Sequence, residues 1–377
     1  MKTMMLKPRD LLFFRDGRPM DQDKTDGEYR NVGHGAVWPR PDHLYNAVMH
    51  GLLGRDAGER EYGKYGDLRT MGPFPCKSGV LYLPRPLDWD MLVEECVGTD
   101  LPYFLKYGFI DREEGKKDYP PWVSLAEFNC YVGGVCPPIG EAELYFTERR
   151  TGNTLDAATG ASKRVAGKRS GQYVAEYLRL AQDVVMWCEI DGGKNVAQLP
   201  TEFVMGGQGG IVREVPAIWE GDDVQKQGRG NSLSLGALLD APDVTAKTRF
   251  VRWTLLTPAY WPETGWLPSW CKDSRKVADV ERRPDGEVMF PDCEGVKLVG
   301  ACTGKPQYFS GWDTLDGIKH TRLVVPAGST YLFECPDAEK AKSLVARLQL
   351  KAMSQLNNQG FGMGVCSAFE NLDDINK

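Results

Sequence analysis

A tight turn with two arginines follows the first apolar run of the chain, in the stretch FFRDGRPMDQ at residues 13–22. Arg15 and Arg18 flank Asp16 on this turn. Because a guanidinium presents a rigid fork of donors, it suits a carboxylate or a phosphate. The turn can therefore hold an acidic side chain of the fold, or an anion from outside it. An exposed pair with Asp16 would contribute less than about 1 kcal/mol, so both arginines stay available for an external anion.

A second basic cluster lies between two strand-like stretches, YFTERR and QYVAEYLRL. The residues between them include no aromatic residue, so we expect an extended hairpin at about 148–172 with a long polar tip. Residues 149–170 contain six basic residues and one acid, a local charge of +5 in a chain of net charge −6. Such a loop can order on a polyanion, or it can be a solvated surface loop. The basic residues are Arg149, Arg150, Lys163, Arg164, Lys168 and Arg169.

Two glycine clusters, GGQGG and GFGMG, each precede a strand-like stretch. A dinucleotide-binding fingerprint runs from strand through glycine turn to helix, whereas GFGMG follows a predicted helix, so we exclude a dinucleotide site. A phosphate-binding P-loop is excluded as well, because Lys168 is followed by Arg169 rather than by Ser or Thr. Glycines in such places can expose backbone N–H groups to a ligand, or they can simply end a helix.

The histidines and cysteines give little support for catalysis or for a metal. His34 stands between two glycines, where it could act as a general base or contact RNA. His43 and His50 are seven residues apart on one predicted helix, which is typical of packing or surface residues. None of the ten cysteines forms a CxxC pair, so we expect reduced, buried thiols and no metal site.

The composition is that of a soluble globular protein with sizeable cores. The chain has 377 residues, of which 42% are apolar, and this length suggests two domains. An acidic total argues only weakly against nucleic acid, because a local basic patch can act within it. No apolar run reaches the roughly 18 residues of a membrane span, and the first residues do not form a signal peptide. We therefore expect a cytoplasmic protein.

The order of predicted elements favours an α+β fold with two similar halves. A strand spans residues 4–14 with an interruption at Pro8, and a helix begins at Pro41. The clearest helix spans residues 337–356, with Asp337 as its N-cap. Both halves run from an opening strand through middle strands and a glycine loop to a last strand, which suggests two ferredoxin-like domains. We expect a first domain at 1–220 that includes the basic hairpin, a linker at 221–245, and a second domain at 246–377.

Four motifs, in this order along the chain, resemble one protein family. They are LKPRDLLFFRDGRPMD, GGQGG followed by Arg213, FSGWDTLDGIKHTRLVVPAGSTYLFE, and QGFGMGV. Together they look like subunit 3 of the Cmr effector complex of type III-B CRISPR systems, a RAMP-superfamily protein. The resemblance spans nearly the whole chain, and FFRDGRP and the SGWD to VPAGS block are its most specific parts. Residues 54–140 match least, so no site is carried over from there.

The resemblance implies a fold, a role and partners. Such proteins have two ferredoxin-like, or RRM-like, RAMP domains, and they are not known as nucleases. They hold the 5′ handle of the crRNA, dock on the large polymerase-like Cmr subunit, and adjoin a backbone RAMP subunit. The resemblance therefore implies antiviral defence by a ribonucleoprotein, with no catalytic residue, no metal and no cofactor in this chain.

Carried over onto this sequence, the resemblance assigns RNA contacts to the arginine turn, the loop after it, the hairpin and both glycine loops. In the loop after the turn, Trp38 could stack on an unpaired base. The expected RNA-binding residues are Arg15, Arg18, His34, Trp38, Arg40, Arg149, Arg150, Lys163, Arg164, Lys168, Arg169, Gly207, Gln208, Gly209, Gly210, Arg213, Gly360, Gly362 and Gly364.

Three functions stay open from the sequence. The first is a non-catalytic crRNA-binding scaffold. The second is a metal-independent endoribonuclease that matures guide RNA, with His34 as general base. The third is a protein-only scaffold whose arginines form internal salt bridges. Salt-dependent RNA binding separates the first from the third, and cleavage on a denaturing gel separates the first from the second.

Overall fold

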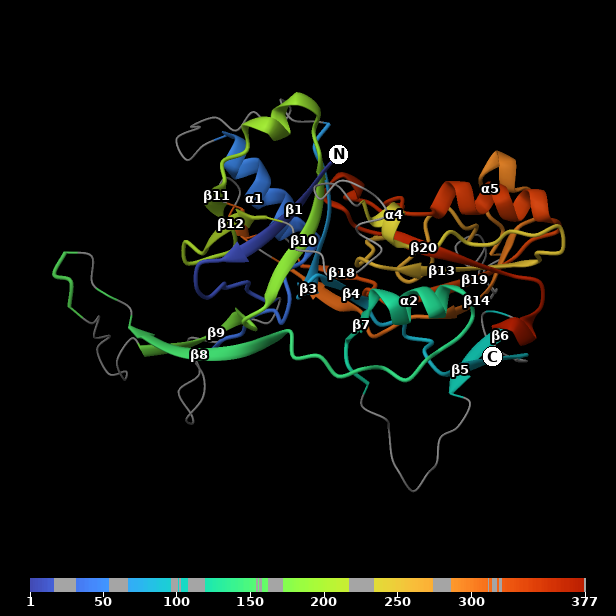
Figure 1. Ribbon diagram of the computed structural model, residues 1–377, viewed down its shortest axis with the longest axis horizontal. Helices are drawn as coiled ribbons and strands as arrows, with labels where there is room; N and C mark the ends of the chain where they lie inside the picture. The colour runs from blue at the N-terminus through green and yellow to red at the C-terminus, as the bar shows by residue number, and fades with distance from the viewer. Residues whose placement is uncertain are drawn as a thin grey trace, which may run out of the picture.

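The two largest β-sheets lie side by side in the computed structural model of the chain (Figure 1). Strands dominate over helices, and most neighbouring strands are antiparallel, so the fold is mixed and compatible with the predicted α+β class. The structure describes residues 1–16, 32–53, 67–95, 101, 103–107, 119–153, 155, 158–161, 172–216, 234–273, 286–310, 312–313, 317–318 and 321–375.

The first sheet has seven strands, and one helix covers one of its faces. The strands are β1 (Lys2–Pro8), β3 (Arg69–Lys77), β4 (Val80–Pro84), β7 (Trp122–Ser124), β10 (Val184–Asp191), β11 (Glu202–Val204) and β12 (Ile211–Val215). Their order in the sheet is β11-β12-β1-β10-β3-β4-β7. Helix α1, Pro41–Leu53, buries Leu44 in one core with Met4 and Leu6 of β1. Met5 belongs to a different core, as the alternation of a strand requires.

The second sheet has four strands and packs against one helix. The strands are β13 (Phe250–Leu255), β14 (Lys297–Cys302), β19 (Thr330–Glu334) and β20 (Gly364–Phe369), in the order β14-β19-β13-β20. Helix α5, Ala338–Leu348, buries Leu344 in the same core as Trp253 of β13. Asp337 caps this helix by accepting a hydrogen bond from the Lys340 N–H at 2.8 Å, which confirms the predicted N-cap.

A third core joins the two sheets. Helix α2, Leu125–Val132, contributes the fully buried Tyr131 to this core, together with Trp187 of the first sheet and Val365 of the second. The short helix α4, Leu235–Leu238, packs into the same core. The described part of the expected linker, residues 234–245, thus includes a helix that packs into this core, while the domain boundaries stay a prediction.

A buried ion pair crosses this shared core. Arg252 of β13 lies 3.5 Å from Asp88 and donates to the carbonyl oxygen of Tyr131 at 2.6 Å. The Tyr131 hydroxyl donates to Asp88 at 2.8 Å. Burial raises the pKa of Tyr131 well above its ordinary value, so the hydroxyl keeps its proton. The network links β13 of the second sheet to α2 and to the segment after β4, and removing one member would leave a buried charge without its partner.

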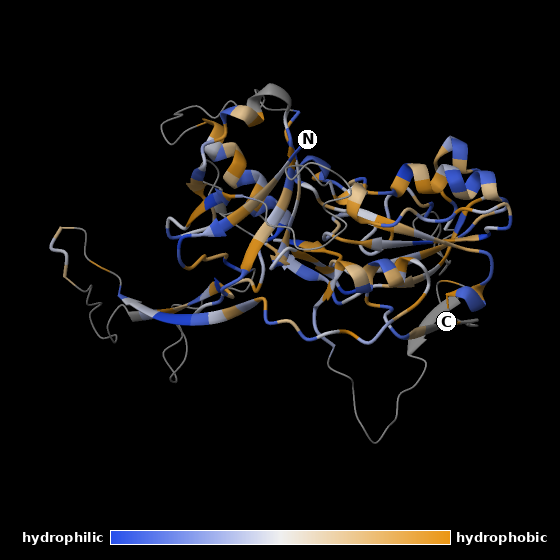
Figure 2. Cartoon of the chain, in the orientation of Figure 1, coloured by the Kyte–Doolittle hydropathy of each residue, from blue (hydrophilic) through white to orange (hydrophobic). Residues whose placement is uncertain are grey.

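A long two-stranded arm projects from the body of the molecule (Figure 1). It consists of β8, Tyr145–Asn153, and β9, Gln172–Leu180, which pair antiparallel. Strand β2, Val32–Gly33, adds to β9 in parallel. Figure 2 shows mostly hydrophilic residues along β8. These strands confirm the predicted hairpin, while its tip at residues 162–171 lies outside the described residues.

Short strand pairs and 3₁₀ turns complete the described chain. They are β5 (Met91–Glu95) with β6 (Tyr103–Tyr107), β15 (Gln307–Phe309) with β18 (Arg322–Val324), β16 (Trp312–Asp313) with β17 (Gly317–Ile318), and the turns η2 (Gly193–Gln198), η4 (Pro291–Cys293), η5 (Asn357–Gln359) and η6 (Leu372–Asp374).

One predicted helix ends earlier than expected. Helix α5 stops at Leu348 instead of Leu356, because Leu350 adopts a left-handed φ of 53° and the chain turns back along β20. By contrast, the strand expected over residues 4–14 is interrupted at Pro8 as predicted, and beyond it only single bridges form. Proline donates no hydrogen bond to a strand ladder, which explains this end.

Candidate nucleic-acid interface

The arginine turn is held in place by single backbone bridges to three other segments. Arg15 is exposed, and within the described part of the chain its guanidinium makes no ion pair. The Asp16 N–H donates to the carbonyl oxygen of His34 at 3.1 Å, which fixes the turn beside the following loop. Arg18 lies outside the described residues. The bridges are Leu12 to Leu178, Phe13 to Gly207, and Arg15 to Gly35.

Three side chains next to the turn form a linked cluster. The Glu176 carboxylate, on β9, lies 3.1 Å from Nδ1 of His34 and accepts two hydrogen bonds from Arg149, at 3.1 and 2.9 Å. Burial raises the pKa of Glu176, but the hydrogen bonds from His34 and Arg149 outweigh it and hold that pKa below its ordinary value. Glu176 is thus a carboxylate at neutral pH. The Arg149 side chain is 72% exposed, so much of its guanidinium can meet an anion.

The GGQGG loop lies against the same turn. It connects β11 and β12, and the Gly207 N–H donates to the Phe13 carbonyl at 2.8 Å. A side chain is excluded at Gly206, where a Cβ would lie 2.7 Å from that oxygen. Gln208 and Gly209 are exposed and left-handed, with φ of 61° and 69°. A Cβ at Gly209 would meet no atom within 4 Å, so the loop offers open backbone beside the turn.

Arg150 projects from the side of the arm opposite Arg149, because neighbouring residues of a strand face opposite ways, and there it pairs with acidic side chains. Its guanidinium lies 2.8 Å from Glu148 and 3.7 Å from Asp10. Arg179 contacts the same acids at 2.5 and 3.3 Å. Hydrogen bonds from Arg179 and Arg150 lower the pKa of Glu148. The charges of the two arginines and the two acids in this network cancel, so it suits a phosphate less well than the exposed guanidinium of Arg149 does.

Trp38 packs among aromatic neighbours. Its indole N–H donates to the carbonyl oxygen of Pro73 at 2.8 Å. Its ring lies 5.5 Å from that of Trp122 and 5.6 Å from that of Tyr145, measured between centroids. Base stacking by Trp38 stays a prediction, and these contacts give the ring a structural role in the first sheet.

Arg40 is a nearly buried link between distant parts of the chain. Its side chain is 12% exposed, and its Nε lies 3.1 Å from Asp42 at the start of α1. The same guanidinium donates to the carbonyl oxygen of Ser310 at 3.0 Å and lies 4.6 Å from the ring centroid of Phe309. Arg40 therefore joins α1 to the segment after β15, which gives it a structural role, and RNA contact by Arg40 stays a prediction.

The GFGMG loop is buried, unlike GGQGG. Gly360 and Gly362 are left-handed, with φ of 85° and 70°. A Cβ at Gly360 would collide with the carbonyl of Thr70 on β3, and one at Gly364 with the indole of Trp253. These glycines let the backbone pack closely where the two sheets meet. RNA contact by Gly360, Gly362 or Gly364 stays a prediction, and the buried position favours the packing role.

Arg213 and Gly210 are the other predicted residues that the structure describes. Arg213 is exposed on β12, where its cross-strand partners are Lys7 and Glu202. Gly210 follows the exposed part of the loop, and its N–H donates to the carbonyl oxygen of Gly207 at 3.3 Å. The predicted contacts at the hairpin tip, Lys163, Arg164, Lys168 and Arg169, lie outside the described residues.

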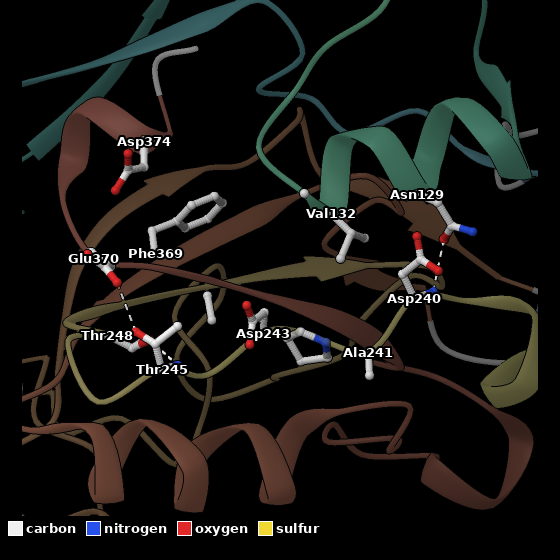
Figure 3. Close-up of a pocket in the computed structure, with 13 residues that line it drawn as sticks. Asn129, Val132, Asp240, Ala241, Asp243, Thr245, Thr248, Phe369, Glu370 and Asp374 are labelled. Carbon is white, nitrogen blue, oxygen red and sulfur yellow. Dashed lines mark hydrogen bonds between the residues drawn. The ribbon is translucent and has the colours of Figure 1, made fainter.

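An acidic cleft of about 350 Å³ lies elsewhere, between the end of α2 and the end of β20 (Figure 3). Its carboxylates are Asp240, Asp243, Glu370 and Asp374, and the described residues that line it include no Lys or Arg. Such a lining repels the phosphates of RNA. None of the predicted residues that the structure describes lines this cleft, so the candidate interface is the exposed surface around the arginine turn.

The described ranges show neither a metal cluster nor a membrane span. Among their residues, no group of three or more His, Cys, Asp or Glu is placed to hold a metal ion. No helix within them is long and apolar enough to cross a bilayer. Burial raises the pKa of the Cys76 thiol to about 12, which leaves it unreactive at neutral pH.

Glu176, the residue that organises the cluster, is not among the residues predicted from the sequence. Its only local signal is an acid within the alternating apolar pattern of QYVAEYLRL. Which cations it meets depends on the register of β9 against β8 and on the approach of β2, and neither is visible in the sequence.

Comparison with protein-family models identifies the family of this chain. The model of the CRISPR-associated protein family Cas_Cmr3 matches residues 4–367. The chain belongs to this family. The match includes the arginine turn, the arm and both glycine loops, and it confirms the CRISPR resemblance of the four motifs. A comparison with curated proteins found no match.

Solved structures of type III CRISPR complexes contain similar chains. One, from the type III-B Cmr-beta complex bound to cognate target RNA, has a TM-score of 0.47 and 14% identity over 92% of this chain and 88% of that chain. One from the Csm3–Csm4 subcomplex of the type III-A interference complex has a TM-score of 0.35 and 11% identity over 88% and 92%. One from a Csm1–Csm4 cassette in complex with cA4 has a TM-score of 0.34 and 14% identity over 87% and 98%.

Proposed function

We propose that this Cas_Cmr3-family chain is a non-catalytic crRNA-binding scaffold of a type III-B Cmr effector complex in antiviral defence. It caps the 5′ handle of the crRNA, docks on the large polymerase-like subunit and adjoins a backbone RAMP subunit, in the cytoplasm and without metal or cofactor. The observation that carries the proposal is one exposed surface, the turn face, where separate segments of the first sheet and the arm meet. The turn face consists of Arg15, His34, Arg149, Gln208 and Gly209.

The sheet orders support two ferredoxin-like domains of RAMP type. Numbered along the chain, β12-β1-β10-β3 of the first sheet has the order 4-1-3-2, with α1 between its first and second strands. The strands β20-β13-β19-β14 of the second sheet have the same order, with α5 between the third and fourth. Four-stranded sheets of this kind are common RNA-binding modules.

The chemistry of the turn face suits a phosphate backbone. Arg15 and Arg149 present guanidiniums, whose forked donors match phosphate oxygens. Glu176 holds Arg149 in place without covering it. The left-handed residues Gln208 and Gly209 turn the backbone so that it can approach RNA closely.

The test uses the full chain assembled with its large-subunit partner and a 5′-labelled guide RNA, without added metal. Binding is titrated at three salt concentrations, and half of each sample is run on a denaturing gel. We expect intact RNA, and log affinity that falls with log salt by about 0.7 per phosphate contact. Scrambling the handle should weaken binding. Affinity that does not depend on salt would contradict the proposal.

One observation favours a second candidate, a metal-independent endoribonuclease that matures guide RNA. The hydrogen bond from Nδ1 of His34 to Glu176 is the arrangement that orients a histidine as a general base. In the same experiment, cleaved guide RNA that becomes intact in the His34→Ala variant would select the nuclease over the scaffold.

A further inference from the structure

An exposed apolar pair lies on the two-stranded ribbon of β15 and β18. Tyr308 and Leu323 are direct cross-strand partners, so their side chains project from the same face. They are 63% and 55% exposed. Phe309 and Val324 face the other way and are buried. The ribbon therefore has one packed face, and one apolar face open to solvent.

The packed face anchors the ribbon to the rest of the molecule. The Phe309 ring makes an edge contact with Phe361 of the GFGMG loop, with centroids 5.4 Å apart. The guanidiniums of Arg40 and Arg322 lie 4.6 and 5.9 Å from the same ring. Through Arg40, the ribbon is tied to the loop that starts at His34 on the turn face. Tyr308 thus projects from a fixed support.

Lys305 precedes the ribbon, and Arg322 lies on its second strand. Residues 303–310 and 321–326 include Lys305 and Arg322 but no Asp or Glu. Lys305 is exposed. Arg322 is the cross-strand partner of Phe309 and projects to the packed face, where its guanidinium lies 5.2 Å from the Tyr260 ring centroid. An exposed aromatic ring with Lys305 three residues before it, in a chain of net charge −6, suits a ligand that has both a flat π face and negative charge.

We propose that Tyr308, supported by Leu323, is a stacking platform for one unpaired base of single-stranded RNA, with the exposed Lys305, three residues before Tyr308, as a partner for an adjoining phosphate. This inference rests on the proposed RNA-binding function and extends it from the turn face to the second sheet. Two apolar side chains match the size of one base, whereas a stable protein interface covers about 800 Å² on each partner. Loss of the ring should lower RNA affinity about 5- to 150-fold.

The test uses the full chain assembled with its large-subunit partner and a guide RNA that carries 5-iodouridine at each position of the 5′ handle in turn. After irradiation, mass spectrometry should find a crosslink on the peptide that contains Tyr308. Tyr308→Ala should remove that crosslink and lower affinity by the stated factor, while Tyr308→Phe keeps both. Because stacking neutralises no phosphate, the salt slope of Tyr308→Ala should equal that of the wild type. Met289→Ala, at another exposed apolar residue (56% exposed), should change nothing.

The outcomes separate this inference from the proposed function. Salt-dependent binding by the wild type, with no crosslink at Tyr308 and full affinity in Tyr308→Ala, overturns the platform and leaves the scaffold proposal standing. A wild-type complex that binds no RNA overturns both. If Tyr308→Ala releases the large subunit while the chain keeps its RNA affinity, this face docks protein and the inference is wrong.

Discussion

Replacing Arg40 by methionine should destabilise the protein rather than only weaken RNA binding. The Arg40 side chain is 12% exposed, lies 3.1 Å from Asp42 and donates to the Ser310 carbonyl at 3.0 Å. Methionine keeps an extended side chain that can still pack on Phe309, but it removes every donor. The carboxylate of Asp42, which is 5% exposed, loses the guanidinium of Arg40 as a partner, and the contact between α1 and the β15 segment is broken.

The expected loss is about 2–4 kcal/mol of unfolding free energy. Removing one partner of a buried ion pair typically costs about 3–5 kcal/mol. Asp42 stands in the first turn of α1, where the helix dipole stabilises its negative charge by up to about 1 kcal/mol and so reduces the loss.

Urea unfolding followed by tryptophan fluorescence measures this loss, and Arg9→Met is the matched control. Arg9 pairs with Glu202 on the surface, with its side chain 56% exposed, so its loss should cost less than about 1 kcal/mol. Folded Arg40→Met should keep the wild-type salt slope of RNA binding. A stability loss no larger than that of Arg9→Met, together with a shallower salt slope, would refute the structural role and return Arg40 to the RNA contacts.

Three further predictions concern the packing and the charges around the site. Gly360→Ala should strongly destabilise the folded protein, because the φ of Gly360 is 85° and the new Cβ would collide with the carbonyl of Thr70. In Gly209→Ala the new Cβ meets no atom, so the left-handed backbone should cost only about 1–2 kcal/mol of unfolding free energy. Thermal unfolding compares the two variants. The pKa of Glu176 is lowered in the folded state, so its contribution to stability is present above its unfolded pKa and is lost as pH falls through the folded pKa. Glu176→Gln should therefore flatten the acid side of the stability–pH curve, and an unchanged curve would count against the cluster. Tyr131→Phe removes the hydroxyl contacts with Asp88 and Thr254 and should cost about 1–3 kcal/mol in urea; a wild-type value would show that this network does not hold the sheets together.

Elements with local signals could be predicted from the sequence. Helix α1 follows from apolar residues at helical spacing, and the N-cap at Asp337 follows from cap chemistry within one turn. The end of α5 could not be predicted in the same way. It depends on the pairing of residues 349–352 with the segment at β20, which is a tertiary contact.

At the candidate interface, too, the sequence shows the residue types but not the partners that they meet. Basic residues are obvious in the sequence, but their availability depends on the fold. Arg149 and Arg150 are neighbours, yet one is largely exposed beside Glu176 and the other lies in a balanced network with Glu148. Arg40 meets a carbonyl 270 residues further along the chain, a contact that no local pattern indicates.

The salt dependence of guide RNA binding by Arg15→Ala tests the central claim most directly. The variant is assembled with the large subunit and compared with the wild type and with Arg179→Ala, a change within the balanced network of the arm. If Arg15 contacts a phosphate of the handle, the slope of log affinity against log salt becomes shallower by about 0.7 for Arg15→Ala and stays unchanged for the control. A wild-type slope and affinity in Arg15→Ala would contradict the assignment of the turn face to RNA.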